Sequence, residues 1–146
     1  MEEKFDYEYK LQDVYFPCIY FLLKNEKVVY VGQTEYGLKR ILCHPADKDF
    51  DTIRTIKCKS ENLDEMEMKY IAKYQPLYNK QLPNACSSMR LKQILTHNGL
   101  RVRKDIIKRW IMNNVKEYYV FCGEIYVAEK DKISTLNGIF EFINNK

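Results

Sequence analysis

Five side chains in the first half of the chain stand out because each departs from the pattern of the segment that carries it. They are Tyr20, Tyr30, Arg40, His44 and Glu67. Phenol, imidazole and carboxylate groups can exchange protons, and a guanidinium can bind an anion. Each of these groups alone is common on a solvated surface, so chemistry would require that the fold gather them at one place.

The two tyrosines lie in two predicted strands, residues 17–23 and 28–33. Side chains alternate between the faces of a strand, so Tyr20 and Tyr30 each lie opposite the aliphatic and phenylalanine side chains of their own strand. If both aliphatic faces point to the core, the phenols share the other face, away from the main apolar layer. A connecting loop with an odd number of residues gives that register, and a two-residue loop does not. Gly32 leaves room beside the phenols.

Arg40 and His44 belong to a short predicted helix within residues 36–45, which Pro45 is expected to end. They are four residues apart and so lie on one face of the helix. That face is away from the apolar stripe formed by leucine and isoleucine. The alternative is a solvated arginine and an incidental histidine at a helix end.

Glu67 lies in a longer helix, predicted after a third strand near residues 52–58 and started by a cap at Asn62 or Asp64. It falls near the middle of the apolar stripe of this helix, which is formed by Leu63, Met66, Tyr70, Ile71 and Tyr74. An unpaired carboxylate on an apolar face is costly. Glu67 therefore marks either a functional site or a pair with a buried arginine or tyrosine.

The strictly alternating residues 5–12 predict a further edge strand, with a short helix as the competing interpretation. The polar residues 81–88 mark the best boundary and predict two domains, residues 1–82 and 83–146. The second contains a helix capped by Ser87 or Ser88 and ended at Gly99. A helix follows, whose core stripe is formed by Ile106, Ile107, Trp110 and Ile111. After it come a hairpin that turns at Gly123 and a closing helix near residues 131–143.

Composition limits the classes of protein. The 146 residues contain no apolar run of the ~20 residues that a membrane helix needs. The acidic start lacks the features of a secretory signal, and five scattered cysteines suggest reduced cytosolic thiols. Residues 1–85 hold 13 basic and 14 acidic side chains, and residues 86–146 hold 11 and 6, so the net charges are −1 and +5. A basic second half suggests a binding module.

Taken in order, these residues resemble the GIY-YIG nuclease family, from about Pro17 to Lys80. Cys18-Ile19-Tyr20 stands where that family has Gly-Ile-Tyr, and Tyr30-Val31-Gly32 stands where it has Tyr-Ile-Gly. Arg40, His44, Glu67 and the later Asn79 follow at positions that match the family's remaining site residues. The departure is Cys18 in place of glycine.

The resemblance implies an α+β fold, a small three-stranded antiparallel sheet with flanking helices. It implies hydrolysis of phosphodiester bonds with one Mg²⁺ or Mn²⁺ ion, which Glu67 would bind. Arg40 would bridge phosphate oxygens, and Tyr20 would be the general base or water-positioning group, supported by Tyr30. His44 would help to remove the phenol proton, and Asn79 would orient the glutamate or the backbone around the site.

The second half resembles a winged helix-turn-helix of the excisionase-like type over residues 86–146, with a basic structural appendage as the alternative. Its second helix opens with the basic residues Arg101, Arg103, Lys104 and Lys108, which suit phosphates and major-groove edges. Together the two resemblances imply a cytoplasmic endonuclease of homing, restriction or phage type, in a bacterial or phage-infected cell, that acts on double-stranded DNA without a membrane. Cutting both strands with one site needs either a homodimer on DNA or two successive nicks.

Two alternatives stay open at this point. One is a DNA-binding regulator in which the GIY-YIG-like domain is weakened or inactive, as Cys18 suggests. The other is a structure-selective repair nuclease, or one acting on RNA. The retention of all six polar residues of the resemblance favours an active nuclease over the regulator.

Overall fold

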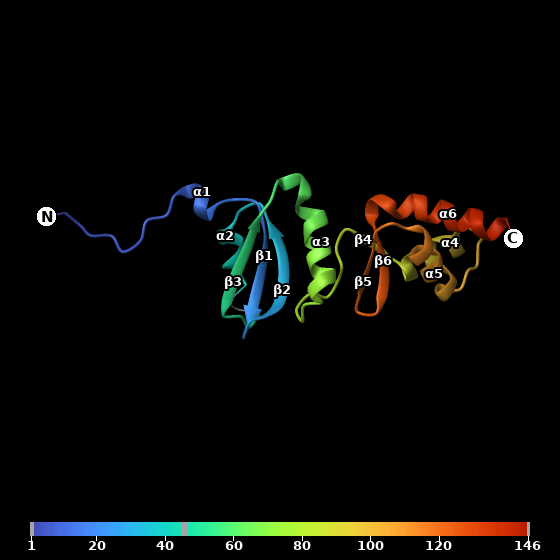
Figure 1. Cartoon of the computed structure of the whole chain (residues 1–146), viewed down its shortest axis with the longest axis horizontal. Coiled ribbons are helices and arrows are strands. Elements are labelled where there is room, and N and C mark those ends of the chain that lie inside the picture. Colours follow the sequence, from blue (N-terminus) through green and yellow to red (C-terminus); the bar gives the residue numbers. More distant parts are fainter. Residues whose placement is uncertain (1, 45–46, 146) are drawn as a thin grey trace. The chain divides into compact units, whose positions relative to one another are not determined.

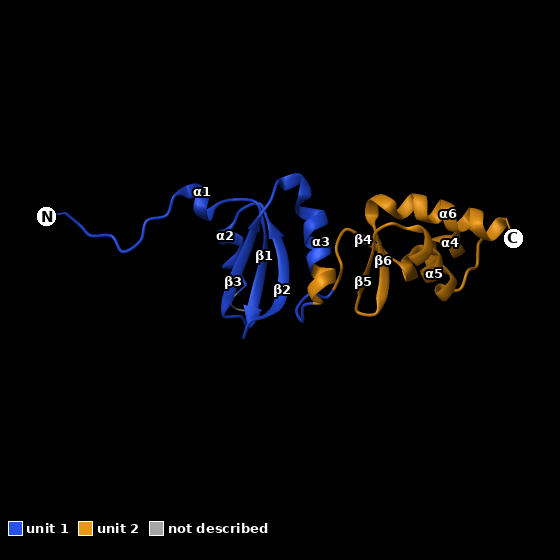
Figure 2. Cartoon of the chain, in the orientation of Figure 1, with its two compact units in different colours: residues 1–70, 76–80 blue, residues 71–75, 81–146 orange. Residues whose placement is uncertain are grey.

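The structure is a computed structural model that describes residues 2–44 and 47–145. Its contacts divide the chain into two compact units, residues 1–70 with 76–80 and residues 71–75 with 81–146 (Figure 2). Each unit combines helices with one three-stranded antiparallel sheet, so the α+β class is confirmed for the described residues (Figure 1). Within those residues no helix is both long and apolar enough to cross a bilayer.

The first unit is built around the sheet β2-β1-β3, in which β1 is the central strand. The three strands predicted near residues 17–23, 28–33 and 52–58 and the longer helix are confirmed. The elements in chain order are α1 (Leu11–Val14), β1 (Cys18–Lys24), β2 (Lys27–Thr34), α2 (Leu38–Ile41), β3 (Thr52–Lys57), the 3₁₀ turn η1 (Ser60–Asn62) and α3 (Leu63–Tyr74), whose residues up to Tyr70 belong to this unit.

Both faces of this sheet are covered, which fixes the surroundings of the tyrosines. On one face the Phe21 ring meets the ring of Tyr70 from α3 edge to face, with centroids 5.1 Å apart. On the other face Tyr20 packs in a cluster with Leu22 and with Ile41 from α2. Tyr20 thus lies on the face opposite the Phe21 layer, as predicted, but it is only 1% exposed, because this face of the sheet is packed as well.

The hairpin between β1 and β2 has the predicted arrangement of the tyrosines, but a bulge produces it instead of the predicted loop length. Its turn has only two residues, Asn25 and Glu26, both with positive φ (51° and 67°). The register shifts between Leu22 and Leu23, which leaves Val29 without a cross-strand partner in a β-bulge. The extra residue brings both Val29 and Tyr30 to the cluster that contains Tyr20. The predicted loop length is wrong, and the predicted shared face of the two tyrosines is confirmed.

Three local predictions fail in the first unit. Residues 5–10 form no strand, because no neighbouring strand pairs with them, and a helical turn follows at Leu11–Val14. Helix α2 has only four residues and ends before His44, so Leu42 is exposed instead of buried; Pro45 lies outside the described residues. In α3, Met68 is buried where Met66 was expected, and Tyr74 is 42% exposed.

The second unit has the sheet β4-β6-β5 packed with three helices among its described residues. Its elements are β4 (Ala85–Ser87), α4 (Ser88–His97), α5 (Lys104–Asn114), β5 (Tyr118–Phe121), β6 (Glu124–Ala128), the 3₁₀ turn η2 (Glu129–Asp131) and α6 (Lys132–Asn144). The predicted helices and hairpin are confirmed. The short strand β4 was not predicted, because it pairs with β6 about forty residues later.

The ends and core of these helices follow the sequence closely. The Ser87 hydroxyl accepts a hydrogen bond from the Arg90 amide at 3.0 Å and so caps α4, which ends beside Gly99 at φ 85°. Ile107 and Ile111 of α5 are fully buried in the core of the unit, and Ile106 and Trp110 pack against it. The helix cap and the predicted core stripe are both confirmed.

Candidate active site

A buried hydrogen bond between Tyr20 and His44 is the centre of the candidate site. The Tyr20 hydroxyl lies 2.6 Å from His44 Nε2, and both side chains are almost completely buried. The His44 amide donates to the Ile41 carbonyl at 3.2 Å, so a turn continuing from α2 sets its position. The Tyr30 ring lies against both, with centroids 6.0 Å from Tyr20 and 5.1 Å from His44.

The electrostatic surroundings keep this pair neutral. Burial, followed by the neighbouring Tyr30, raises the pKa of Tyr20 well above its usual value near 10. Burial, followed by the positive charges of Lys48 and Arg40, lowers the pKa of His44 below 6.5. His44 Nδ1 faces Asp47 Oδ1 at 4.0 Å. This favours a proton on Nδ1, so Nε2 accepts the hydrogen bond that the Tyr20 hydroxyl donates.

Gly32 provides the space for the Tyr20 ring. It is the direct cross-strand partner of Tyr20, and a Cβ atom on Gly32 would lie 2.5 Å from both Cζ and Oη of that ring. The ring therefore crosses β2 above a residue that has no side chain. The predicted role of Gly32 is confirmed.

Two cations border the pair, and one of them was not predicted. Arg40 is exposed, and its charge lowers the pKa of both Tyr20 and His44. Lys48 was missed: its Nζ lies 4.7 Å from the centre of the Tyr30 ring and pairs with Asp47 at 3.1 Å. The only sequence signal was its spacing of four residues from His44, which the intervening proline makes unreliable.

Glu67 is held beside the outer edge of β2. It lies between Leu63 and Ile71 along the buried side of α3, and hydrogen bonds from the side chain and backbone of Gln33 reach it. Burial, with a smaller contribution from Asp64, nevertheless raises the pKa of its carboxyl group. Its negative charge also contributes to the raised pKa of Tyr20, so the carboxylate is close enough to the phenol to interact with it electrostatically.

Asn79 lies on the same edge, and its side chain forms hydrogen bonds with the backbone of β2. Its side-chain oxygen accepts from the Val31 amide, and its side-chain nitrogen donates to the Val31 carbonyl, both at 2.9 Å. The Tyr78 amide donates to the Val29 carbonyl, also at 2.9 Å. Asn79 thus pairs with β2 as a strand residue would, and it fixes the strand that carries Tyr30.

The donors in this unit fit a divalent cation bound by one carboxylate. Among the described residues, no group of three histidine, cysteine or acidic side chains is arranged to enclose a metal ion. Mg²⁺ does not need such a cage, because it keeps several waters and takes one or two carboxylates together with substrate phosphates. Glu67, with a raised pKa and Asp64 nearby, has the negative surroundings that such a cation would relieve.

Cys18, the departure from the family pattern, is part of the core. It is fully buried in the cluster around Tyr20, and burial raises the pKa of its thiol to about 11. A neutral thiol with a volume close to that of a small apolar side chain is well suited to this position. All five cysteines are free thiols.

The four basic residues predicted to bind DNA lie in two different settings. Lys104 Nζ is 2.7 Å from Glu124, and Lys108 Nζ is 3.9 Å from it, while the Ser88 hydroxyl also bonds to this carboxylate. Arg101 and Arg103 are exposed and line a groove with Lys92, Thr96 and Val102, and Arg103 also forms an exposed ion pair with Asp105 at 3.0 Å. The structure therefore brings only the two arginines together in one groove, where Arg101 and Lys92 form no ion pair with a described residue and Lys92 was not predicted.

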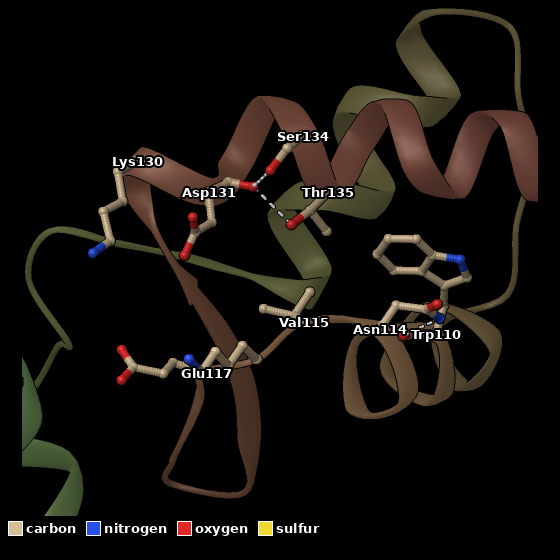
Figure 3. A pocket seen from close by; sticks show the side chains of 9 residues that line it. Trp110, Asn114, Val115, Glu117, Lys130, Asp131, Ser134 and Thr135 are labelled. Carbon is tan, nitrogen blue, oxygen red and sulfur yellow. Dashed lines mark hydrogen bonds between the residues drawn. The ribbon is translucent and has the colours of Figure 1, made fainter.

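A second hollow of this unit lies beside Trp110 (Figure 3). Its uncharged polar side chains bond locally: Ser134 and Thr135 donate to the Asp131 carbonyl, and Asn114 donates to the Trp110 carbonyl. Side chains that already bond to their own helix do not require a ligand. We assign no function to this hollow.

Comparison of the chain with protein-family models, with curated proteins and with solved structures gave no match.

Proposed function

We propose that this protein is a metal-dependent endonuclease of the GIY-YIG type that hydrolyses DNA phosphodiester bonds. The observation that carries the proposal is the buried Tyr20–His44 hydrogen bond, with Arg40 and Glu67 both close enough to change the pKa of Tyr20. Residues from β1, β2, α2, the following turn and α3 converge on this point. Buried ionisable groups with strongly shifted pKa values are typical of active sites.

The proposed proton movement begins from the neutral pair. As a water attacks phosphorus, its proton passes to the Tyr20 oxygen, while the phenol proton passes to His44 Nε2. Tyr20 holds its proton firmly in the free protein, so the transfer requires positive charge near the phenol. Arg40 supplies part of this charge and is exposed, so it can also bind the phosphate oxygens.

Glu67 would bind the divalent cation, Mg²⁺ or Mn²⁺. When bound, the cation would polarise the phosphoryl oxygen and stabilise the leaving oxyanion. Tyr30 and Gly32 would hold the Tyr20 ring in place, and Asn79 would keep β2 fixed. Lys48 would keep the imidazole of His44 neutral and ready to accept a proton.

The second unit would deliver the nuclease to DNA as a winged helix-turn-helix. Its helices α4 and α5, its β5–β6 hairpin and its charge of +5 over residues 86–146 support this role. Phosphate contacts would come first from Arg101 and Arg103, together with Lys92 of the same groove. Homing, restriction and phage enzymes are the proposed setting.

Plasmid cleavage with Mg²⁺ or Mn²⁺ tests the proposal directly. Wild type is compared with Glu67→Gln, which removes the charge of the proposed ligand and keeps its size. The matched control is Glu65→Gln, on the same helix, whose carboxylate pairs with Lys69 at 3.1 Å on the surface. We expect wild type and the control to cut and Glu67→Gln to be inactive.

The alternatives give different outcomes in the same experiment. A protein that cuts branched DNA or RNA but not the plasmid is the structure-selective or RNA nuclease. A protein that binds DNA with strong salt dependence but cuts no substrate is the regulator, and Cys18→Gly then tests for recovered activity. Cleavage by Glu67→Gln at the wild-type rate would refute the metal assignment.

A further inference from the structure

An N-terminal segment, residues 5–10 and here called the arm, has the pattern of a strand but no partner. Phe5, Tyr7 and Tyr9 alternate with polar residues and are 81%, 79% and 69% exposed. The Tyr7 and Tyr9 rings stack, with centroids 6.3 Å apart, as expected for one face of an extended chain. Three large aromatic side chains in a row, all exposed, indicate a segment that is covered by something other than its own monomer.

The same unit has a strand edge without a partner. Among the residues that the structure describes, strand β3 pairs with β1 alone. The Cys58 amide donates to the Pro17 carbonyl, so the alternation of an antiparallel ladder directs the backbone groups of residues 53, 55 and 57 outward. Within the described residues, no backbone hydrogen bond reaches this outer edge. Such an edge is a template for an added strand.

The charges of the two segments are complementary. The arm contains Asp6, Glu8 and Lys10, a net charge of −1, and with the preceding residues 2–4 the net charge is −2. Residues 52–59 contain Arg54, Lys57 and Lys59 and no acidic side chain, a net charge of +3. Like charges on neighbouring edges keep sheets apart, and opposite charges favour pairing.

The two faces of the segments also match. If the aromatic face of the arm lies on the side of Ile56, which is 39% exposed, the aromatic rings cover this isoleucine. Asp6 and Glu8 then lie on the opposite face, which is the face of Lys57. One register thus places the apolar side chains together and sets Asp6 and Glu8 beside Lys57, while Arg54 shares the face of Ile56.

We propose that the arm of one copy adds to the outer edge of β3 in a second copy, as a fourth strand of its sheet. The arm is tethered to its own chain and still leaves the β3 edge of that chain bare, which points to a different molecule. Reciprocal exchange of two arms closes a dimer with twofold symmetry and leaves neither edge exposed. This inference does not depend on the proposed nuclease activity.

Molar mass measured over a range of concentrations tests the exchange. We expect wild type to reach twice the chain mass of 17.6 kDa, and a variant lacking residues 2–10 to remain at the mass of one chain. Thr55→Pro removes one outward amide from β3 and is tolerated at an edge that needs no such donor. It is expected to abolish dimerisation with an unchanged circular dichroism spectrum, whereas the matched Thr55→Val, which keeps the amide, retains the dimer.

Exchanging the charges of the two segments is an independent second test. Reversal of Asp6 and Glu8 to lysine is expected to weaken the dimer about threefold to tenfold, and reversal of Lys57 and Lys59, which follow the parity of that face, to glutamate is expected to do the same. The protein with all four changes should recover wild-type affinity. A wild type that is monomeric at every concentration would overturn the proposal. So would a dimer that survives both the deletion and Thr55→Pro, or arm amides protected from hydrogen exchange in the monomer.

Discussion

Replacing Gly32 with alanine is expected to displace the Tyr20 ring. The new Cβ would lie 2.5 Å from Cζ and Oη and 2.9 Å from Cε1, whereas atoms in contact normally stay ~3.5–4.0 Å apart. The ring must therefore move by about 1 Å. Tyr20 is 1% exposed and is bordered by Tyr30 and His44, so no open space can take the ring.

The size of the effect follows from two opposing contributions. Overpacking a buried side chain costs about 1–3 kcal/mol. Replacing glycine within a strand returns about 0.5–1 kcal/mol, because alanine loses less conformational entropy on folding. We expect Gly32→Ala to lower the free energy of unfolding by about 1–2 kcal/mol. A displacement of about 1 Å at the reacting group is also expected to reduce cleavage about 10²-fold.

Urea unfolding of a double-mutant cycle isolates the clash. The four proteins are wild type, Gly32→Ala, Tyr20→Ala and the double variant. Without the ring the added methyl group meets no obstacle, so Gly32→Ala should be neutral or stabilising in the Tyr20→Ala background. The sign of its effect therefore reverses between the two backgrounds. An equal cost in both, or a Gly32→Ala protein as stable as wild type, would refute the packing argument.

Three further predictions concern residues around and beyond this ring. Asn79→Ala removes both hydrogen bonds to the backbone of β2 and should lower the free energy of unfolding by about 1–3 kcal/mol, as measured in urea. His44 has a lowered pKa in the folded state, so its contribution to stability is full above pH ~6.5 and is lost as pH falls below it. Lys48→Met raises this pKa and should move the acid limb of the pH–rate profile to higher pH; an unchanged profile contradicts the proposed role of the lysine. Burial raises the pKa of Glu124, but hydrogen bonds, first from Lys104, outweigh it and lower this pKa overall. Glu124→Gln should therefore destabilise the protein most at neutral pH, and the difference from wild type should disappear in acid. Thermal melts at both pH values measure this difference.

The sequence predicted the elements better than their partners. Strands β1 to β3, the longer helices and the Ser87 cap of α4 follow from local periodicity and capping residues, and these predictions were correct. Residues 5–10 have an equally clear strand pattern, but a strand needs a neighbour to pair with, and the pattern does not say whether one exists. Strand β4 shows the opposite case, because its short polar sequence gave no signal and its partner β6 is distant in the chain.

The candidate site was predictable as a set of residues but not as an arrangement. Tyr20, Tyr30 and His44 were identified from departures from periodicity and from the ordered motif, and they lie together. The burial of Tyr20 depends on α2 covering that face of the sheet, which no local pattern shows. Lys104 and Lys108 have the spacing of a phosphate-binding helix, but Glu124 from the later hairpin pairs with both.

The bulge at Val29 makes the hairpin tolerant of one change in chain length. Deleting this residue would leave Leu23 opposite Val28 and Leu22 opposite Tyr30, so it would give a regular ladder and keep Tyr30 on the face of Tyr20. A residue inserted into the Asn25–Glu26 turn would likewise leave these pairs in place. The arrangement is lost only when the chain keeps its length and the ladder becomes regular, because Phe21 would then pair with Tyr30 and turn the tyrosine to the other face of the sheet. In homologous chains the bulged hairpin and a regular hairpin one residue shorter could therefore replace each other in a single step.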